Sequence, residues 1–177
     1  MNTIFFHEDF YKLIEFLPKE NYFEISHYNK NNSNFSKQNT FGFIEMDIIP
    51  PPTFKLIDRK IPIAALEKIL NQHSIFFSDN INSGYGNTSY DMDNIIGYGY
   101  EYFTIFVSYE SEIVSDIWIW DSKINEGTGE NFVKTISLII DTFDLLLIDW
   151  RKLLIIYSDS YDIIKKYLNI FTWASIK

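Results

Sequence analysis

The chain has 177 residues, no cysteine and a formal net charge of −9 at neutral pH. Its length fits one domain, since a core of this size removes roughly 70% of the unfolded chain's surface from water, and the absence of cysteine excludes disulfides, thiolate metal sites and cysteine nucleophiles. The longest apolar runs, at 145–148 and 153–157, fall far short of the roughly 20 residues that cross a bilayer, and the N-terminal residues lack the basic start of a secretory signal. We therefore expect a cytoplasmic protein.

The first third of the chain predicts one helix followed by extended segments. Apolar residues repeat with helical spacing over 7–17, and a proline ends that helix. Residues 20–28 predict a strand, and the asparagine-rich stretch 29–39 predicts a flexible surface loop. Two further extended segments, 40–49 and 54–58, are expected on either side of three consecutive prolines.

The middle of the chain predicts a helix and then a β-hairpin. Pro62 suits the first turn of a helix over 63–72, where apolar residues repeat on one side. Residues 78–89, rich in Asn, Ser and Gly, are typical of turns. Alternating residues then predict strands over 95–120 with a break at 110–112, which is the pattern of an antiparallel hairpin.

The last third predicts two strands between two helices. The helices are expected over 129–143 and 160–171. Residues 145–150 and 153–157 predict two strands around a tight turn, and a single long helix through this stretch is the competing interpretation. Because helices and strand pairs are segregated, the predicted fold is α+β, with a mainly antiparallel sheet and flanking helices in a single domain over 1–177.

The negative charge is concentrated in one segment. Residues 79–130 contain ten acidic residues and one basic residue, and the rest of the chain has equal numbers of each. A field of this sign repels nucleic acids and anionic membranes and attracts basic proteins. We therefore expect a basic protein partner and binding to neither nucleic acid nor membrane, while the simpler interpretation is that the charge only maintains solubility.

Tyrosine and tryptophan side chains accompany these carboxylates. In the second strand of the hairpin, alternation places Ile113, Ile117 and Ile119 on one face. The opposite face is expected to hold Val114, Asp116, Trp118 and Trp120. If buried, these aromatics belong to the core; if exposed beside carboxylates, they have the composition of interface hot spots. The candidate partner-binding residues are Asp91, Asp93, Tyr100, Glu101, Tyr102, Glu112, Asp116, Trp118, Trp120 and Asp121.

No catalytic or metal-binding motif is recognisable. None of the three histidines has a second histidine at a spacing that aims two rings at one ion, and the calcium-like start at 91–93 lacks the glycine and glutamate that complete such a loop. The Gly-Tyr-Gly motifs at 84–86 and 97–99 lack the residues of a phosphate loop, so backbone turns are expected there. We expect no metal, no cofactor and no enzymatic activity.

Two other functions stay open. A hydrolase with a carboxylate-lined cleft would use Asp91, Asp93 or Glu101 on a cationic or carbohydrate substrate, provided that folding places one carboxylate in an apolar pocket. A structural or adaptor protein would instead use the aromatic face to form a homodimer. The sequence leaves the oligomeric state undefined.

The last third of the chain also carries a family resemblance. The segment Phe143-Asp144-Leu145-Leu146-Leu147-Ile148-Asp149-Trp150, the strand that follows and the helix over 161–168 resemble small bacterial immunity proteins, as do the size, acidity and α+β order of the chain. These proteins are the antidotes of contact-dependent growth inhibition and other polymorphic toxin systems. The resemblance implies a non-enzymatic inhibitor that binds one cognate toxin domain, often a basic nuclease, and blocks its active site or substrate-binding surface. It assigns binding to no particular residue, because such families use different faces.

Overall fold

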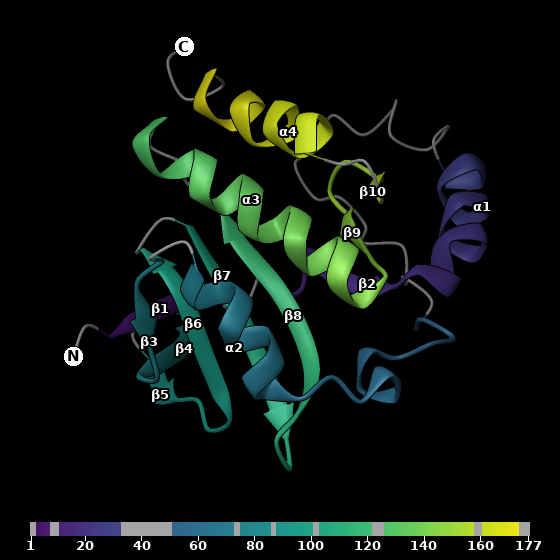
Figure 1. Ribbon diagram of the computed structural model, residues 1–177. Coiled ribbons are helices and arrows are strands. Elements are labelled where there is room, and N and C mark those ends of the chain that lie inside the picture. The colour runs from purple at the N-terminus through teal and green to yellow at the C-terminus, as the bar shows by residue number, and fades with distance from the viewer. Residues whose placement is uncertain are drawn as a thin grey trace.

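A seven-stranded antiparallel sheet organises the computed structural model (Figure 1). The structure describes residues 3–7, 11–32, 51–72, 75–85, 88–100, 103–121, 126–157 and 161–173. The strands of this main sheet are, in spatial order, β10 (Leu154–Ile156), β9 (Leu145–Asp149), β2 (Ile14–Pro18), β8 (Ile113–Asp121), β7 (Phe103–Glu110), β6 (Ile95–Tyr100) and β3 (Phe77–Ser78). The predicted α+β class with a mainly antiparallel sheet is confirmed.

Three helices cover one face of the main sheet. They are α2 (Ile63–Gln72), α3 (Glu126–Phe143) and α4 (Tyr161–Trp173). Leu66, Ile136 and Ile164 are the fully buried centres of their apolar stripes, and they pack in one cluster with Ile105 and Leu147 of the sheet. This is the largest core of the protein, and it spans the sheet from β6 to β10.

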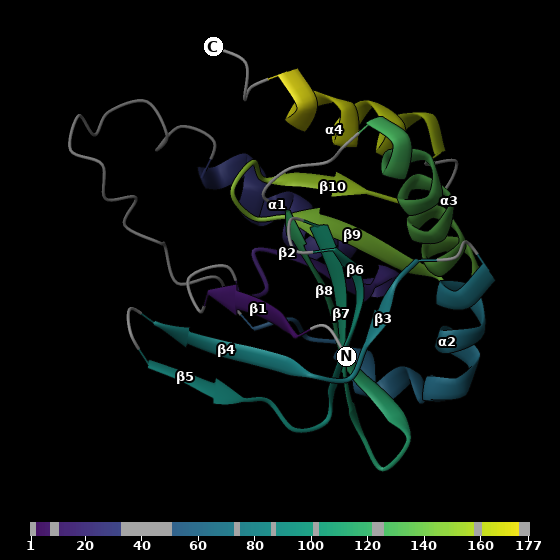
Figure 2. The ribbon, with the colours of Figure 1, turned by 90° about the vertical axis from the view of Figure 1, so that its left-hand side faces the viewer.

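The opposite face is covered in two parts. A second sheet lies over β6 to β8, and helix α1 (Tyr22–Asn32) packs on β2 and β9 (Figure 2). The second sheet consists of β1 (Ile4–His7), β4 (Ile81–Tyr85) and β5 (Thr88–Asp91), with β1 and β4 parallel. Because both faces are covered, β9 is buried at every residue, which accounts for its continuous apolar sequence.

The helix predicted over 7–17 is wrong. Its described residues are the end of β1, a turn at 11–13 and most of β2, and β2 lies between β8 and β9. Ile14 and Phe16 face the largest core, while Leu17 packs on the opposite side with Ile25. Apolar residues at these positions satisfy helical spacing and a two-sided strand equally well, and pairing with two distant strands favours the strand.

The strand predicted over 20–28 is also wrong. Residues Lys19–Asn21 form the 3₁₀ turn η2, and α1 follows directly. The buried Asn21 amide donates to the carbonyls of Pro18 (3.1 Å) and Phe54 (2.8 Å) and accepts from the Phe54 N–H (3.1 Å). These bonds end β2 and tie it to the segment after the prolines, so the chain turns instead of continuing as a strand.

Other predictions in the first half have mixed outcomes. The strand predicted over 54–58 is wrong, because Leu56–Arg59 form the 3₁₀ helix η4. The loop predicted over 29–39 is wrong at its start, which belongs to α1, and 33–39 and 40–49 lie outside the described residues. The helix over 63–72 is confirmed as α2.

The turns expected at the glycine-rich motifs are strands wherever the structure describes them. Gly84 lies in β4, and Gly97 and Gly99 lie in β6. A Cβ on Gly97 would lie only 3.0 Å from the Ile81 methyl group and 3.2 Å from that of Ile4. Glycine is therefore used here because the second sheet packs directly on the backbone of the main sheet.

The C-terminal elements follow the prediction. The helices α3 and α4 and the β9–β10 hairpin are confirmed, and the competing single helix is wrong. The buried Asp149 accepts from Arg151 Nε and Nη2 at 3.0 Å each and from the Tyr167 hydroxyl at 2.6 Å. This carboxylate joins the hairpin turn to α4. In the described part of the chain, no helix is both long and apolar enough to cross a bilayer.

Candidate functional site

Five exposed carboxylates gather at one end of the main sheet. Ile95 at the start of β6 pairs with Ser108 near the end of β7, so the turn before β6 and the turn after β7 are neighbours. Strand β3 runs antiparallel to β6, and the residue after it therefore reaches the same end. We call the following residues the acidic end: Asp79, Asp91, Asp93, Glu110 and Glu112.

Backbone hydrogen bonds hold both of these turns. The Tyr109 N–H donates to the Asn94 carbonyl at 3.1 Å, which ties the turn before β6 to β7. On the other side of the hairpin, the Ile63 N–H donates to the Glu112 carbonyl at 2.9 Å. The carboxylates thus project from a fixed backbone, and a partner that binds them loses little free energy in ordering it.

Within the described part of the chain, the acidic end has no ion-pair partner. Five acidic residues elsewhere do form ion pairs: Glu20 with Arg59, Asp116 with Lys12, Glu130 with Lys134, Asp144 with Lys19, and Asp149 with Arg151. Others, such as Glu67, Asp141 and Asp162, form no ion pair with a described residue, but they are not gathered on neighbouring turns. Unpaired carboxylates therefore lie close together where the two turns meet, and they add to one another's field.

The structure divides the predicted binding surface between the two ends of the sheet. Asp91, Asp93 and Glu112 belong to the acidic end. Trp120 lies eight residues beyond Glu112 in β8, about 26 Å away along an extended strand. Tyr100 ends β6 and Asp121 ends β8 at that same far end, and their side chains lie outside the described part of the structure, as do residues Glu101 and Tyr102.

Trp118 is a core residue, so the prediction that it contacts a partner is wrong. Its side chain is completely buried, stacks on Phe106 at 5.3 Å between ring centroids and meets Tyr11 edge-on at 5.1 Å. Trp120 is half-buried and packs against the same cluster.

The charge on Asp116 is compensated inside the fold. Its carboxylate accepts from Lys12 Nζ at 2.5 Å and from the Ser108 hydroxyl at 3.0 Å. The side chain is half-buried, so it contributes less to the surface than the residues of the acidic end. Asp91 ends β5 and Asp93 lies on the turn that follows, and both are exposed, which differs from the apolar pocket that the hydrolase alternative requires.

Of the carboxylates that the structure describes, Glu15 has the pKa that is raised most, and no sequence motif singles it out. Burial raises its pKa to about 7, Asp116 adds to the rise, and the Trp150 indole N–H and Lys12 oppose it. Trp150 Nε1 donates to Glu15 Oε1 at 2.8 Å. This hydrogen bond fixes the indole ring beside β2, and only the pairing of β2 with β9 brings the two residues together.

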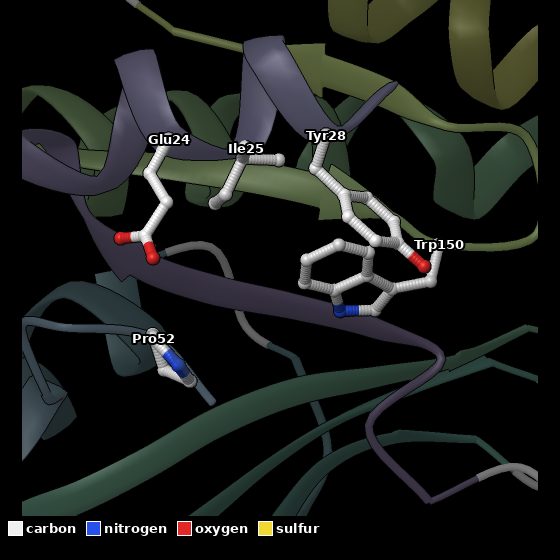
Figure 3. A pocket seen from close by; sticks show the side chains of 5 residues that line it. All are labelled: Glu24, Ile25, Tyr28, Pro52 and Trp150. Carbon is white, nitrogen blue, oxygen red and sulfur yellow. The ribbon is translucent and has the colours of Figure 1, made fainter. Parts of the chain in front are cut away.

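A small hollow lies beside this indole ring, between α1 and the end of β9 (Figure 3). Its lining residues are Glu24, Ile25, Tyr28, Pro52 and Trp150. The enclosed space is about 10 Å³, which is room for about one water molecule. It is too small for a sugar ring or a peptide segment.

Among the described residues, no group of three or more His, Asp and Glu side chains is arranged to hold a metal ion. The chain matches no protein-family model, no curated protein and no solved structure. The class of the protein is thus defined by its α+β fold, and the candidate site by the geometry of its acidic end.

Proposed function

We propose that this protein is a cytoplasmic immunity protein that binds a basic toxin domain through the acidic end. The main support is the set of five exposed carboxylates without ion-pair partners among the described residues, which lie on and beside two hydrogen-bonded turns. Such a field accelerates the association with a basic partner and disfavours the association with acidic proteins. In a nuclease, these carboxylates would occupy the positions at which the enzyme binds phosphates. The resemblance of the last third of the chain to immunity proteins points the same way.

The test uses the toxin domain encoded beside this gene and two charge-matched double variants. Asp91→Lys with Asp93→Lys changes the acidic end, whereas Asp141→Lys with Asp162→Lys makes the same charge change on exposed positions of α3 and α4. We expect the first pair to lower the association rate by at least about tenfold at low salt, and the second to lower it far less.

Both outcomes are read by surface plasmon resonance at two salt concentrations. A partner that binds equally to both double variants would show that general charge, and not the acidic end, drives association. A neighbouring toxin domain that does not bind the unaltered protein would contradict the proposed function itself. Protection of bacterial cells from that toxin is the corresponding measurement in vivo.

A further inference from the structure

Strand β3 leaves one edge of the main sheet open. It is the last strand of that sheet and pairs with β6 on one side only (Figure 1). Phe77 lies opposite Tyr98, and the Gly99 N–H donates to the Phe76 carbonyl at 2.8 Å. In an antiparallel ladder this bond makes Phe77 and Tyr98 a non-hydrogen-bonded pair, so the N–H and C=O of Phe77 point away from β6. Within the described part of the chain, no other group bonds to them.

The side chains at this edge are aromatic. Phe76 and Phe77 are 40% and 43% exposed, and successive residues of a strand point to opposite faces, so one ring lies on each face of the sheet. Soluble proteins usually protect an open edge with Lys or Pro, and residues 75–80 contain neither. Outward backbone groups between two exposed rings are the features of a site to which a partner adds a strand.

The charge next to β3 selects among possible partners. Asp79, a residue of the acidic end, follows Ser78 directly, and it forms no ion pair with a described residue. A strand that pairs with Phe77 reaches Asp79 two residues further along. A second copy of this chain has a net charge of −9 and is repelled there, whereas a segment with Lys or Arg at this position is attracted. The edge therefore fits a basic partner better than a homodimer.

We propose that the basic toxin domain adds an extended segment to β3. The segment forms main-chain hydrogen bonds with Phe77, packs apolar side chains against the rings of Phe76 and Phe77, and places a Lys or Arg beside Asp79. The identity of the partner rests on the proposed function. The strand addition states how that partner continues from the acidic end onto the sheet.

Amide hydrogen exchange at Phe77 tests the strand addition. Its outward N–H is expected to exchange fast in the free protein, and at least about a hundredfold more slowly in the complex with the toxin domain encoded beside this gene. Phe5 is the matched control, since it is 41% exposed on the edge strand β1. The Ile4 N–H donates to the Asn80 carbonyl, so the N–H of Phe5 points away from β4, and its exchange is expected to stay unchanged.

Two pairs of variants separate the backbone from the rings. Phe77→Ala removes the ring, and Phe77→Pro also removes the N–H without breaking a bond to β6. We expect the dissociation constant of the toxin complex to rise about tenfold in Phe77→Ala and at least about tenfold further in Phe77→Pro. Phe5→Ala and Phe5→Pro make the same changes on β1 and are expected to leave it unchanged. Thermal unfolding of all four variants shows whether each one is folded.

The possible outcomes separate this proposal from the proposed function. If the toxin domain binds but exchange at Phe77 does not slow, or if Phe77→Ala and Phe77→Pro bind equally, strand addition is overturned and binding through the acidic end stands. If exchange at Phe77 slows in the free protein as its concentration rises, a second copy occupies the edge and the proposal is again overturned. A toxin domain that does not bind the unaltered protein contradicts the proposed function, and strand addition falls with it.

Discussion

At the scale of single residues, burial of Glu15 makes stability depend on pH. Its pKa is about 7 in the fold against an ordinary value of 4.5, chiefly because burial disfavours the charged form. The folded protein therefore holds a proton that the unfolded chain releases. Stability is expected to fall as the pH rises from about 4.5 to 7 and to level off above that, with a total loss of up to about 3 kcal/mol.

Glu15→Gln tests this dependence. The neutral amide still accepts from Trp150 Nε1, so the variant is expected to be more stable than the unaltered protein at about pH 8 and similar to it at about pH 4.5. Urea unfolding across this range measures the difference. Asp141→Asn, at an exposed position, is the control. If the free energy of unfolding depends on pH in the same way in Glu15→Gln and in the unaltered protein, Glu15 is not the cause of the pH dependence.

Two glycines of β6 differ in what an added Cβ would contact, which is backbone at Gly99 and a side-chain methyl group at Gly97. At Gly99, where φ is +155°, a Cβ would lie 2.1 Å from the Phe103 carbonyl oxygen. At Gly97 the nearest atom is a methyl group of Ile81 at 3.0 Å, which can move. We expect Gly99→Ala to cost about 3–5 kcal/mol and Gly97→Ala about 1 kcal/mol in denaturant unfolding. Similar losses in the two variants would disprove this explanation.

At the scale of elements, the β7–β8 hairpin combines a poor turn sequence with an acidic surface. Ser111 and Glu112 both have positive φ, 49° and 65°, which is the type I′ geometry that Asn-Gly adopts most easily. Ser111→Asn with Glu112→Gly is expected to raise stability by about 1 kcal/mol and to weaken the proposed toxin binding, because one carboxylate of the acidic end is lost.

The single variant Ser111→Asn is the control for this exchange. It improves the turn and keeps Glu112, so it should retain binding while gaining part of the stability. Thermal unfolding and the binding rate are measured on the same samples. If the double variant gains stability and binds as well as the unaltered protein, Glu112 is not part of the binding surface.

Local patterns predicted those elements whose partners are close in sequence. The α2, α3 and α4 helices and the β9–β10 hairpin follow directly from apolar spacing, and the last two strands pair across a tight turn. Between β7 and β8, however, the register shifts after Ser108 of β7, which leaves Ser115 of β8 without a paired residue in β7, so Val114 packs in the largest core with Ile117 instead of on the face of Trp118. A one-residue bulge reverses the facing of side chains, and alternation alone does not reveal it.

The candidate site was also predicted only where its residues are close in sequence. Asp91, Asp93 and Glu112 were found because they lie in an acidic stretch of sequence, and two turns bring them together. Trp120 of the same stretch is carried to the other end of the sheet by β8, a strand of nine residues. Neighbours in sequence are thus separated by the length of a strand.

At the scale of the whole molecule, β2 connects the two halves of the main sheet. Glu15 pairs with Trp118 of β8 on one side, and Phe16 pairs with Leu147 of β9 on the other. These pairings join residues more than 100 positions apart, which is why no local pattern indicated them. Strand β2 is hydrogen-bonded to both β8 and β9, so neither half of the sheet can open at this point without breaking pairs of β2. We therefore expect the two halves of the sheet to unfold together.

Amide hydrogen exchange tests this cooperativity, with Gly99→Ala as a perturbation confined to β6. If the sheet opens as one unit, the variant lowers the free energy of exchange at Phe16 in β2 and Leu147 in β9 as much as at Ile105 in β7. Gly97→Ala should produce a smaller decrease with the same distribution. A decrease limited to β6 and β7, with β9 unchanged, would instead show that the halves unfold independently and that β2 does not couple them.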